Sequence, residues 1–182
     1  MLRQEITQAR RHGDAMNQDD VVRVIFERFP YGIFVVATSS GDDVLGILAT
    51  WVMQVSFEPP LVAISVEKGG AFSEALKRSG VLSLSLVRAQ DIRVAKGVLK
   101  SGPHIEGSEV RDDFVVSAEG VPALRESAGI LMCRITQMHD SGDHLLIVAE
   151  AASAVPADLA EMMTLRETGW KYRRKPPAKA TG

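Results

Sequence analysis

His144 has the clearest capacity for chemistry, because an imidazole changes its charge near neutral pH and can hydrogen-bond or exchange a proton with a bound molecule. It follows the turn-like stretch Asp140-Ser141-Gly142-Asp143. Spacing alone favours a purely structural histidine bonded to this turn. His139 lies five residues earlier, but a zinc site needs three or four ligands and we find no third. We therefore expect no metal site.

A second candidate is the stretch Lys68-Gly69-Gly70, which stands directly before an expected helix. Free backbone N–H groups at a helix start, close approach at glycine and one positive charge together suit a phosphate group. Lys96 and Lys100 could add further cationic contacts, although such lysines more often form a solvated face. The structural alternative is a glycine helix start with Phe72 in the core.

Cys133 is the only cysteine of the chain, so no internal disulfide framework is expected. It lies in a strand-like pattern, where a free cysteine commonly behaves as a small buried hydrophobe. A catalytic cysteine would need an activating partner, which the sequence does not show. The sequence also contains no phosphate-binding loop and no catalytic serine motif.

The elements that must position these residues are mostly short strands. Hydrophobic patterning predicts strands over 32–38, 44–57, 61–66, 81–87, 114–117, 129–138 and 144–152, and helices over 21–29, 71–79 and 89–99. Residues 101–113 are expected to form a loop. We expect the long strand over 44–57 to bend or bulge near Gly46 or Trp51. The strand over 61–66 is apolar on both faces, so it should be covered on both sides, and a second subunit is one candidate cover.

Antiparallel strands joined by turns, with helices only as crossovers, predict a mainly β (α+β) fold that closes or nearly closes into a barrel. Strand–helix alternation and a Gly-x-Gly-x-x-Gly stretch are both lacking, which argues against a dinucleotide-binding parallel sheet. At 182 residues with 46% hydrophobic residues, one domain is expected. Its boundaries are predicted as a flexible arm over 1–17, the domain over 18–174 and a disordered tail over 175–182.

Charge and hydropathy exclude several classes of partner. The net charge is −2, so nothing favours nucleic acid, and the basic residues near the C-terminus are interpreted as a solvated tail. No apolar run is long enough to span a membrane, and the charged N-terminal segment does not resemble a signal peptide. A cytoplasmic protein is the simplest expectation.

One long segment carries a family resemblance. Residues 46–60 read GILATWVMQVSFEPP and are followed by an apolar strand pattern. This segment resembles the signature of the flavin reductase-like family, whose members bind FMN in an antiparallel, Greek-key-like split β-barrel with short crossover helices. Three further pieces match in the family's order: Phe29-Pro30-Tyr31-Gly32-Ile33, Ser79-Gly80 before a strand, and Gly142-Asp143-His144. The variant with Trp51 resembles the reductase domain that is fused to flavodiiron proteins.

The resemblance implies an oxidoreductase in which NADH or NADPH passes a hydride to FMN, with FAD as a further candidate flavin. Electrons would continue to a flavin, a redox partner protein or oxygen, and the flavin would lie near a homodimer interface. The implied ring-binding residues are Leu48, Ala49, Thr50 and Trp51, the implied phosphate-binding residues are Lys68, Gly69, Gly70 and Phe72, with Lys96 as a further candidate, and His144 would lie at the flavin and nicotinamide edge. The family usually carries Ser and Thr where this chain has Gly70 and Phe72. Trp51 could instead be a core or interface aromatic.

Two other functions remain open at this stage. The same barrel could be a flavin carrier or sensor without turnover, or bind haem through a histidine. It could also be a structural protein with a decayed site, in which case Phe72 should fill the phosphate position.

Overall fold

The computed structural model describes residues 17–156 and 160–170. The expected arm over 1–17, apart from Asn17, and the expected tail over 175–182 lie outside these residues. The barrel forms one unit, Tyr31–Gly169, and helix α2 (Gln18–Phe26) precedes it in the sequence and is described by itself. Within the described residues, no helix is both long enough and apolar enough to cross a membrane.

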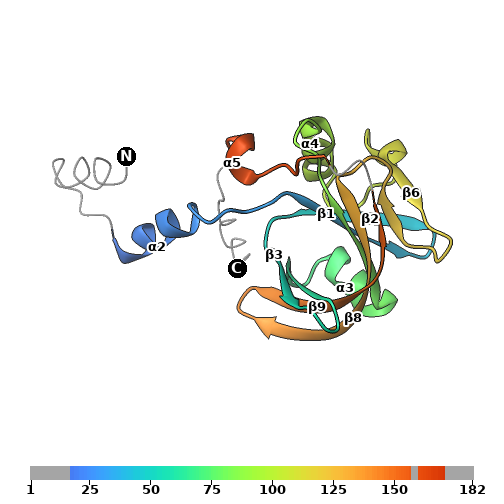
Figure 1. The fold of residues 1–182 in the computed structure, drawn as a ribbon, viewed down its shortest axis with the longest axis horizontal. Coiled ribbons are helices and arrows are strands. Elements are labelled where there is room, and N and C mark those ends of the chain that lie inside the picture. Colours follow the sequence, from blue (N-terminus) through green and yellow to red (C-terminus); the bar gives the residue numbers. More distant parts are fainter. Residues whose placement is uncertain (1–16, 157–159, 171–182) are drawn as a thin grey trace, which may run out of the picture. The chain divides into compact units, whose positions relative to one another are not determined.

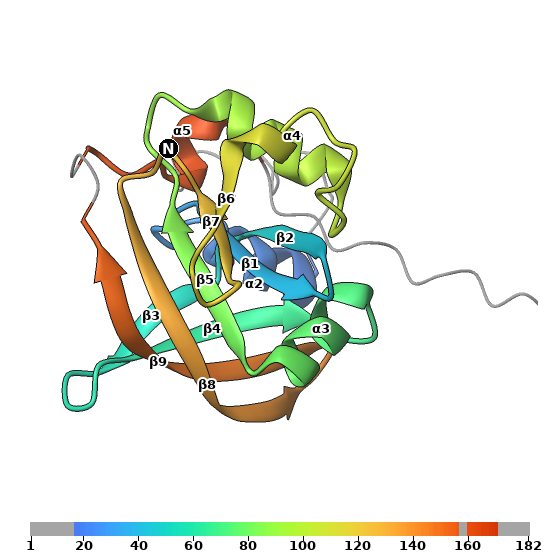
Figure 2. The same cartoon turned by 90° about the vertical axis from the view of Figure 1, so that its right-hand side faces the viewer.

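The barrel is built from one curled antiparallel sheet (Figures 1 and 2). In the described part of the chain this sheet has seven strands, in the spatial order β2-β1-β5-β8-β9-β4-β3. The strands are β1 (Phe34–Ser40), β2 (Asp43–Ala49), β3 (Val52–Ser56), β4 (Leu61–Glu67), β5 (Val81–Leu86), β8 (Gly129–Ser141) and β9 (His144–Val155). The expected mainly β split barrel is confirmed.

The prediction of one long strand over 44–57 is wrong in one respect. The chain forms two strands, β2 and β3, which are separated by Thr50 and Trp51. Strand β2 pairs with β1 and β3 pairs with β4, so the two strands lie at opposite edges of the sheet. The bend expected near Trp51 is therefore a corner at which the chain crosses from one edge to the other. Strand β3 also carries an irregular register between Gln54 and Ser56.

Two helices differ from their predicted bounds for identifiable reasons. Helix α2 begins three residues earlier than expected, because the Asn17 side chain accepts a hydrogen bond from the Asp20 N–H at 2.9 Å and caps it. Helix α4 (Ile92–Ser101) begins three residues later. The residues before it are engaged with a distant segment, since Arg88 forms an isolated bridge with Met162 and the Ala89 N–H donates to the Glu161 carbonyl at 2.8 Å.

Helix α3 (Ala71–Ser79) matches its prediction, with its start at Gly70 and its end at Gly80 in the left-handed conformation. It packs its apolar stripe against the sheet, where Phe72, Ala75 and Leu76 join the core. The core also contains Val62, Ile64 and Val66 of β4, Leu82 and Leu84 of β5, Cys133 of β8, and Leu145, Ile147 and Ala149 of β9. The inward faces of the strands therefore follow the period of two expected for a half-buried sheet.

Several short elements have weak sequence signals. Strand β6 (Phe114–Val116) was expected, but its partner β7 (Pro122–Leu124) and helix α5 (Leu165–Thr168) were not, and the loop over 101–113 ends in a 3-10 turn, η1 (Arg111–Asp113). Two buried serines of β5 hold β7 in place. The Ser83 hydroxyl donates to the Pro122 carbonyl at 2.5 Å, and the Ser85 hydroxyl accepts from the Leu124 N–H at 3.2 Å.

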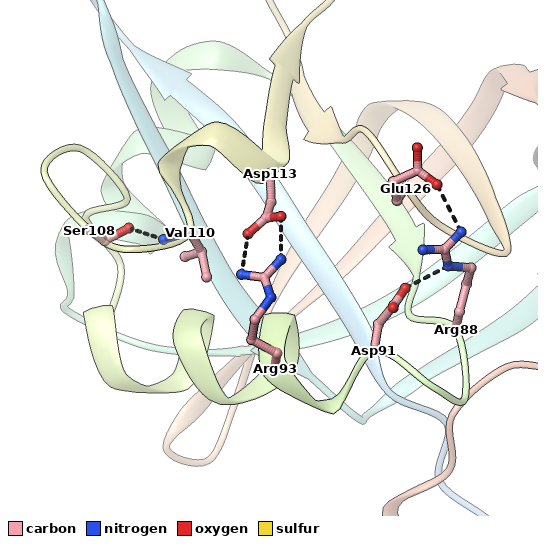
Figure 3. A network of polar contacts seen from close by, with 7 residues as sticks. All are labelled: Arg88, Asp91, Arg93, Ser108, Val110, Asp113 and Glu126. Atoms are coloured by element: carbon pink, nitrogen blue, oxygen red, sulfur yellow. Dashed lines mark hydrogen bonds and ion pairs between the residues drawn. The ribbon is translucent and has the colours of Figure 1, made fainter.

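Ion pairs join α4 and the residues just before it to later segments of the chain (Figure 3). Arg93 forms a bidentate pair with Asp113, with N–O distances of 2.9 and 2.6 Å. Arg88 bridges Asp91 at 2.6 Å and Glu126 at 2.8 Å. The paired carboxylate of Asp113 raises the pKa of the Arg93 guanidinium, mainly through their hydrogen bond. These contacts lie at the α4 end of the barrel.

Gly97 allows α4 to approach the Val110 side chain, and this contact predicts a stability change. A Cβ at position 97 would overlap Cγ1 of Val110, which is fully buried and β-branched and so cannot move aside easily. We expect Gly97→Ala to destabilise the protein by about 1–3 kcal/mol, although alanine normally favours a helix interior. Urea unfolding measures this change, and the neighbouring exposed substitution Lys96→Ala is the control. An unchanged or raised midpoint for Gly97→Ala would contradict the packing described here.

Candidate functional site

The corner between β2 and β3 meets the start of β9. The ring centroids of Trp51 and His144 lie 4.8 Å apart, and the ring planes are tilted by 46°. Trp51 is half-buried, and its carbonyl accepts a hydrogen bond from the Ser65 N–H of β4 at 3.0 Å. The structure thus brings together two of the residues singled out in the sequence.

The His144 ring is also held by its own turn. Its Nδ1 lies 2.7 Å from Oδ1 of Asp143, and its side chain is only 16% exposed. Because a carboxylate accepts hydrogen bonds, Nδ1 carries the proton in this contact, and Nε2 is the nitrogen left to meet a bound molecule. His144 can therefore be bonded to Asp143 of its turn through Nδ1 and still offer Nε2 to a bound molecule.

Lys68 lies beside His144 and Asp143 because of the register between β4 and β9. Glu67 is paired with His144 across these strands, and the Lys68 N–H donates to the Asp143 carbonyl at 3.2 Å. The Lys68 ammonium forms an ion pair with Asp140 of β8 at 2.8 Å. The hydrogen bond from the Lys68 ammonium to the Asp140 carboxylate, together with the positive charge of Lys68, holds the pKa of this carboxyl below its ordinary value.

Gly69 and Gly70 leave open space in front of α3. A Cβ at either position would meet no atom within 4 Å, and Gly69 has a φ of +72°. Gly70 is the N-cap and supplies no side chain to the helix start. The first-turn N–H groups of α3 are therefore not capped by a side chain at this position, as an anion site requires.

Thr50 supplies a buried polar group that lacks a partner. Its side chain is 8% exposed, and within the described residues its hydroxyl makes no hydrogen bond. An unsatisfied buried hydroxyl costs about 1–3 kcal/mol, which a bound molecule with an acceptor or donor at this point would recover. Ala49 beside it is buried and Leu48 is half-buried. The corner thus combines one buried hydroxyl with apolar neighbours.

Two side chains expected at the phosphate do not lie in the space in front of Gly69 and Gly70. Phe72 is 3% exposed and packs in the core, so its side chain does not reach the space in front of the glycines. This is the structural alternative for Phe72, and the decayed-site hypothesis required the opposite placement. Lys96 is exposed on α4, which both views show well apart from α3 (Figures 1 and 2). The family resemblance placed Phe72 near the phosphate, and Lys96 was a candidate only as a lysine on the helix expected over 89–99.

The ion pair of Asp140 with Lys68 is the contact that sequence reasoning missed, since it treated Asp140 as a turn residue. Lys68 can reach Asp140 because β8, β9 and β4 are neighbours in the sheet, which no local pattern contains. The bond between His144 and Asp143, in contrast, is the one that the turn itself favoured. Within the described residues, no group of three or more histidine, cysteine or acidic side chains is arranged to hold a metal ion. Cys133 is 3% exposed in the core, and burial raises the pKa of its thiol to about 12.

The burial of Cys133 predicts that this thiol is unreactive in the folded protein. The thiolate is the reactive form, and both the raised pKa and the apolar surroundings suppress it near pH 8. Labelling with a chromogenic disulfide reagent should be slow for the native protein and rapid and stoichiometric in urea. Rapid labelling of the folded protein would contradict the buried placement.

Comparison with known proteins places the chain in a family. The NADH-dependent FMN reductase of Streptomyces nodosus subsp. asukaensis is 26% identical over 149 residues, covering 81% of this chain and 80% of that protein. The reductase component of 4-hydroxyphenylacetate 3-monooxygenase from Thermus thermophilus is 30% identical over 121 residues, or 66% of this chain and 74% of that protein.

A longer relative and a solved structure extend the comparison. Diflavin flavoprotein A 3 of Synechocystis sp. is 30% identical over 118 residues, 63% of this chain but only 19% of that protein, which confirms the expected relation to such fused domains. The structure of an NADH:FAD oxidoreductase from Streptomyces globisporus superposes with a TM-score of 0.73 at 26% identity, covering 90% of this chain and 96% of that one. The family model for the flavin reductase like domain matches residues 26–169. The chain belongs to the flavin reductase-like family.

Proposed function

We propose that this protein is an FMN-binding oxidoreductase in which NADH or NADPH reduces the flavin. The observation that carries this proposal is the buried Thr50 hydroxyl, which has no hydrogen-bond partner in the part of the chain that the structure describes, beside the Trp51–His144 contact in a chain of this family. Relatives named as FMN and FAD reductases that use NADH support it. FMN is the proposed flavin, and FAD is a second candidate.

The residues of the chain bind and orient, while the flavin supplies the hydride acceptance and onward electron transfer when it is bound. Thr50 donates a hydrogen bond at the ring edge, and Trp51 forms a flat apolar wall. Asp143 fixes the His144 ring so that Nε2 faces the edge where flavin and nicotinamide meet. No side chain needs to act as a nucleophile, which agrees with the burial of Cys133 and the raised pKa of its thiol.

We further propose that the reduced flavin serves a redox partner protein. The Thermus relative is named as the reductase component of a monooxygenase, which supports a two-component arrangement. A cytoplasmic location follows from the proposed use of NADH or NADPH, since these donors are kept inside the cell.

A homodimer is proposed on the basis of the apolar outer face of β3, β4 and β9. Met53 pairs with Ala63, which pairs with Val148, so all three share the face turned away from the core. Met53 is 64% exposed, and Leu146, two residues from Val148 on the same face, is 36% exposed. Such an outer row of apolar residues is more favourably covered by a second copy than by water.

Substituting Thr50 tests the proposed flavin site. Thr50→Val keeps the shape but removes the hydroxyl, so we expect the Kd for FMN to rise by about tenfold while the free protein is no less stable. FMN binding is followed by absorption and flavin fluorescence, and anaerobic NADH should then bleach the bound flavin. Ser127→Ala is the matched control, since Ser127 carries the other buried hydroxyl without a partner among the described residues.

The outcomes of this experiment separate the alternatives. A flavin that binds but is not bleached by NADH or NADPH would indicate a carrier or sensor. A haem spectrum, or no flavin uptake by the native protein, would contradict the proposed function. Equal effects of Thr50→Val and Ser127→Ala would remove Thr50 from the site.

The proposed dimer predicts a change in mass for a charged substitution on the outer face. We expect Met53→Glu to convert the dimer to a monomer, because a buried unpaired charge is costly at an apolar interface. Light scattering coupled to gel filtration measures this. Leu99→Glu, at an apolar residue of α4 that is 60% exposed, is the control and should remain dimeric. A native monomer would overturn the proposal.

A further inference from the structure

Lys68, the cation at the expected phosphate position, is already paired with the carboxylate of Asp140. Lys68 Nζ lies 2.8 Å from Oδ1 of Asp140, and the Asp140 side chain is 81% exposed while that of Lys68 is 33% exposed. Asp143, in the turn that follows β8, is a second acid nearby, and its carbonyl accepts a hydrogen bond from the Lys68 N–H. A phosphate that approached Lys68 would therefore meet carboxylates as well as an ammonium group, which reduces its net attraction.

The start of α3 offers little else to a phosphate. Gly70 has no side chain, and Phe72 is buried in the core. The Ser73 hydroxyl is fully buried and donates to the Gly70 carbonyl at 2.9 Å. Lys77 is held by Glu74 at 2.8 Å on the same helix. Among the described residues, the start of α3 thus offers a phosphate its backbone N–H groups and Lys68, which is already paired with Asp140.

The ring-binding end has a different character. Thr50 is buried and its hydroxyl has no partner among residues 17–156 and 160–170, and the rings of Trp51 and His144 contact each other. Hydrogen bonding and apolar contact there act on the isoalloxazine ring, which all flavins share. Binding energy is therefore concentrated on the ring rather than on the phosphate.

We propose that Asp140 is a specificity-determining residue that competes with the flavin phosphate for Lys68, so that the site accepts riboflavin nearly as well as FMN. This inference rests on the proposed function, because it assumes that the flavin ring lies at Thr50, Trp51 and His144. Removing the carboxylate of Asp140 frees Lys68 to pair with the phosphate. FMN then gains affinity that riboflavin, which lacks a phosphate, does not.

The test compares the Kd values of FMN and riboflavin for the native protein, Asp140→Asn and Asp112→Asn. In the native protein the two Kd values should agree within about threefold, and Asp140→Asn should tighten FMN by about fivefold with riboflavin unchanged, as for one surface ion pair gained. Asp112→Asn is the matched control. It makes the same change in charge at an exposed residue of η1, at the α4 end of the barrel (Figure 2).

A second variant keeps the proposal open to refutation. Adding Lys68→Met to Asp140→Asn should return the ratio of the two Kd values to near one, because the cation that reads the phosphate is gone. A native preference for FMN above about tenfold, which is more than one surface ion pair supplies, would overturn the inference while leaving the proposed function intact. So would an unchanged ratio in Asp140→Asn. Failure of both flavins to bind the native protein would overturn the proposed function itself.

Discussion

The barrel and the candidate site both depend on how the chain turns at Thr50 and Trp51. Strands β2 and β3 are consecutive in the sequence but lie at opposite edges of the sheet, so this corner must join the two edges. A backbone that enters the interior must keep its polar groups paired, and the hydrogen bond from the Ser65 N–H to the Trp51 carbonyl meets part of that need. The same geometry buries the Thr50 hydroxyl and turns the Trp51 ring toward His144. The corner that joins the two edges of the sheet is therefore also where the proposed flavin site lies.

Three segments that are far apart in the sequence meet at the proposed site: the corner itself, the loop from β4 to α3, and the β8–β9 hairpin. The pairing of Glu67 with His144 aligns the last two, and it sets Lys68 beside the acids of the hairpin. The pairing of β4 with β9 thus positions both His144, a proposed binding residue, and the ion pair between Lys68 and Asp140. The α4 end, with its bidentate Arg93–Asp113 pair, is held by contacts of its own (Figure 3).

Local patterns in the sequence were sufficient for most strands, because inward and outward residues alternate clearly, and for α3, because Gly70 and Gly80 mark its ends. They failed where a distant partner decides the outcome. The start of α4 is delayed because Ala89 bonds to Glu161, and β7 is a three-residue strand that depends on buried serines of β5. The resemblance led to the Thr50–Trp51 corner, whereas the ion pair of Lys68 with Asp140 could only be found in three dimensions. Phe72 lay at the family's phosphate position by spacing, but its side chain was needed for the core.

The irregular register of β3 between Gln54 and Ser56 has a consequence for how copies of this protein can meet. An edge strand with an uninterrupted row of backbone donors and acceptors invites further strands to add without limit. Here the row is broken and Val55 is left outside the regular pairing, so the edge is a poor template. Contact through the face of the sheet, in contrast, can close upon itself after two copies. The irregular pairing of β3 thus favours an assembly of limited size over a fibre.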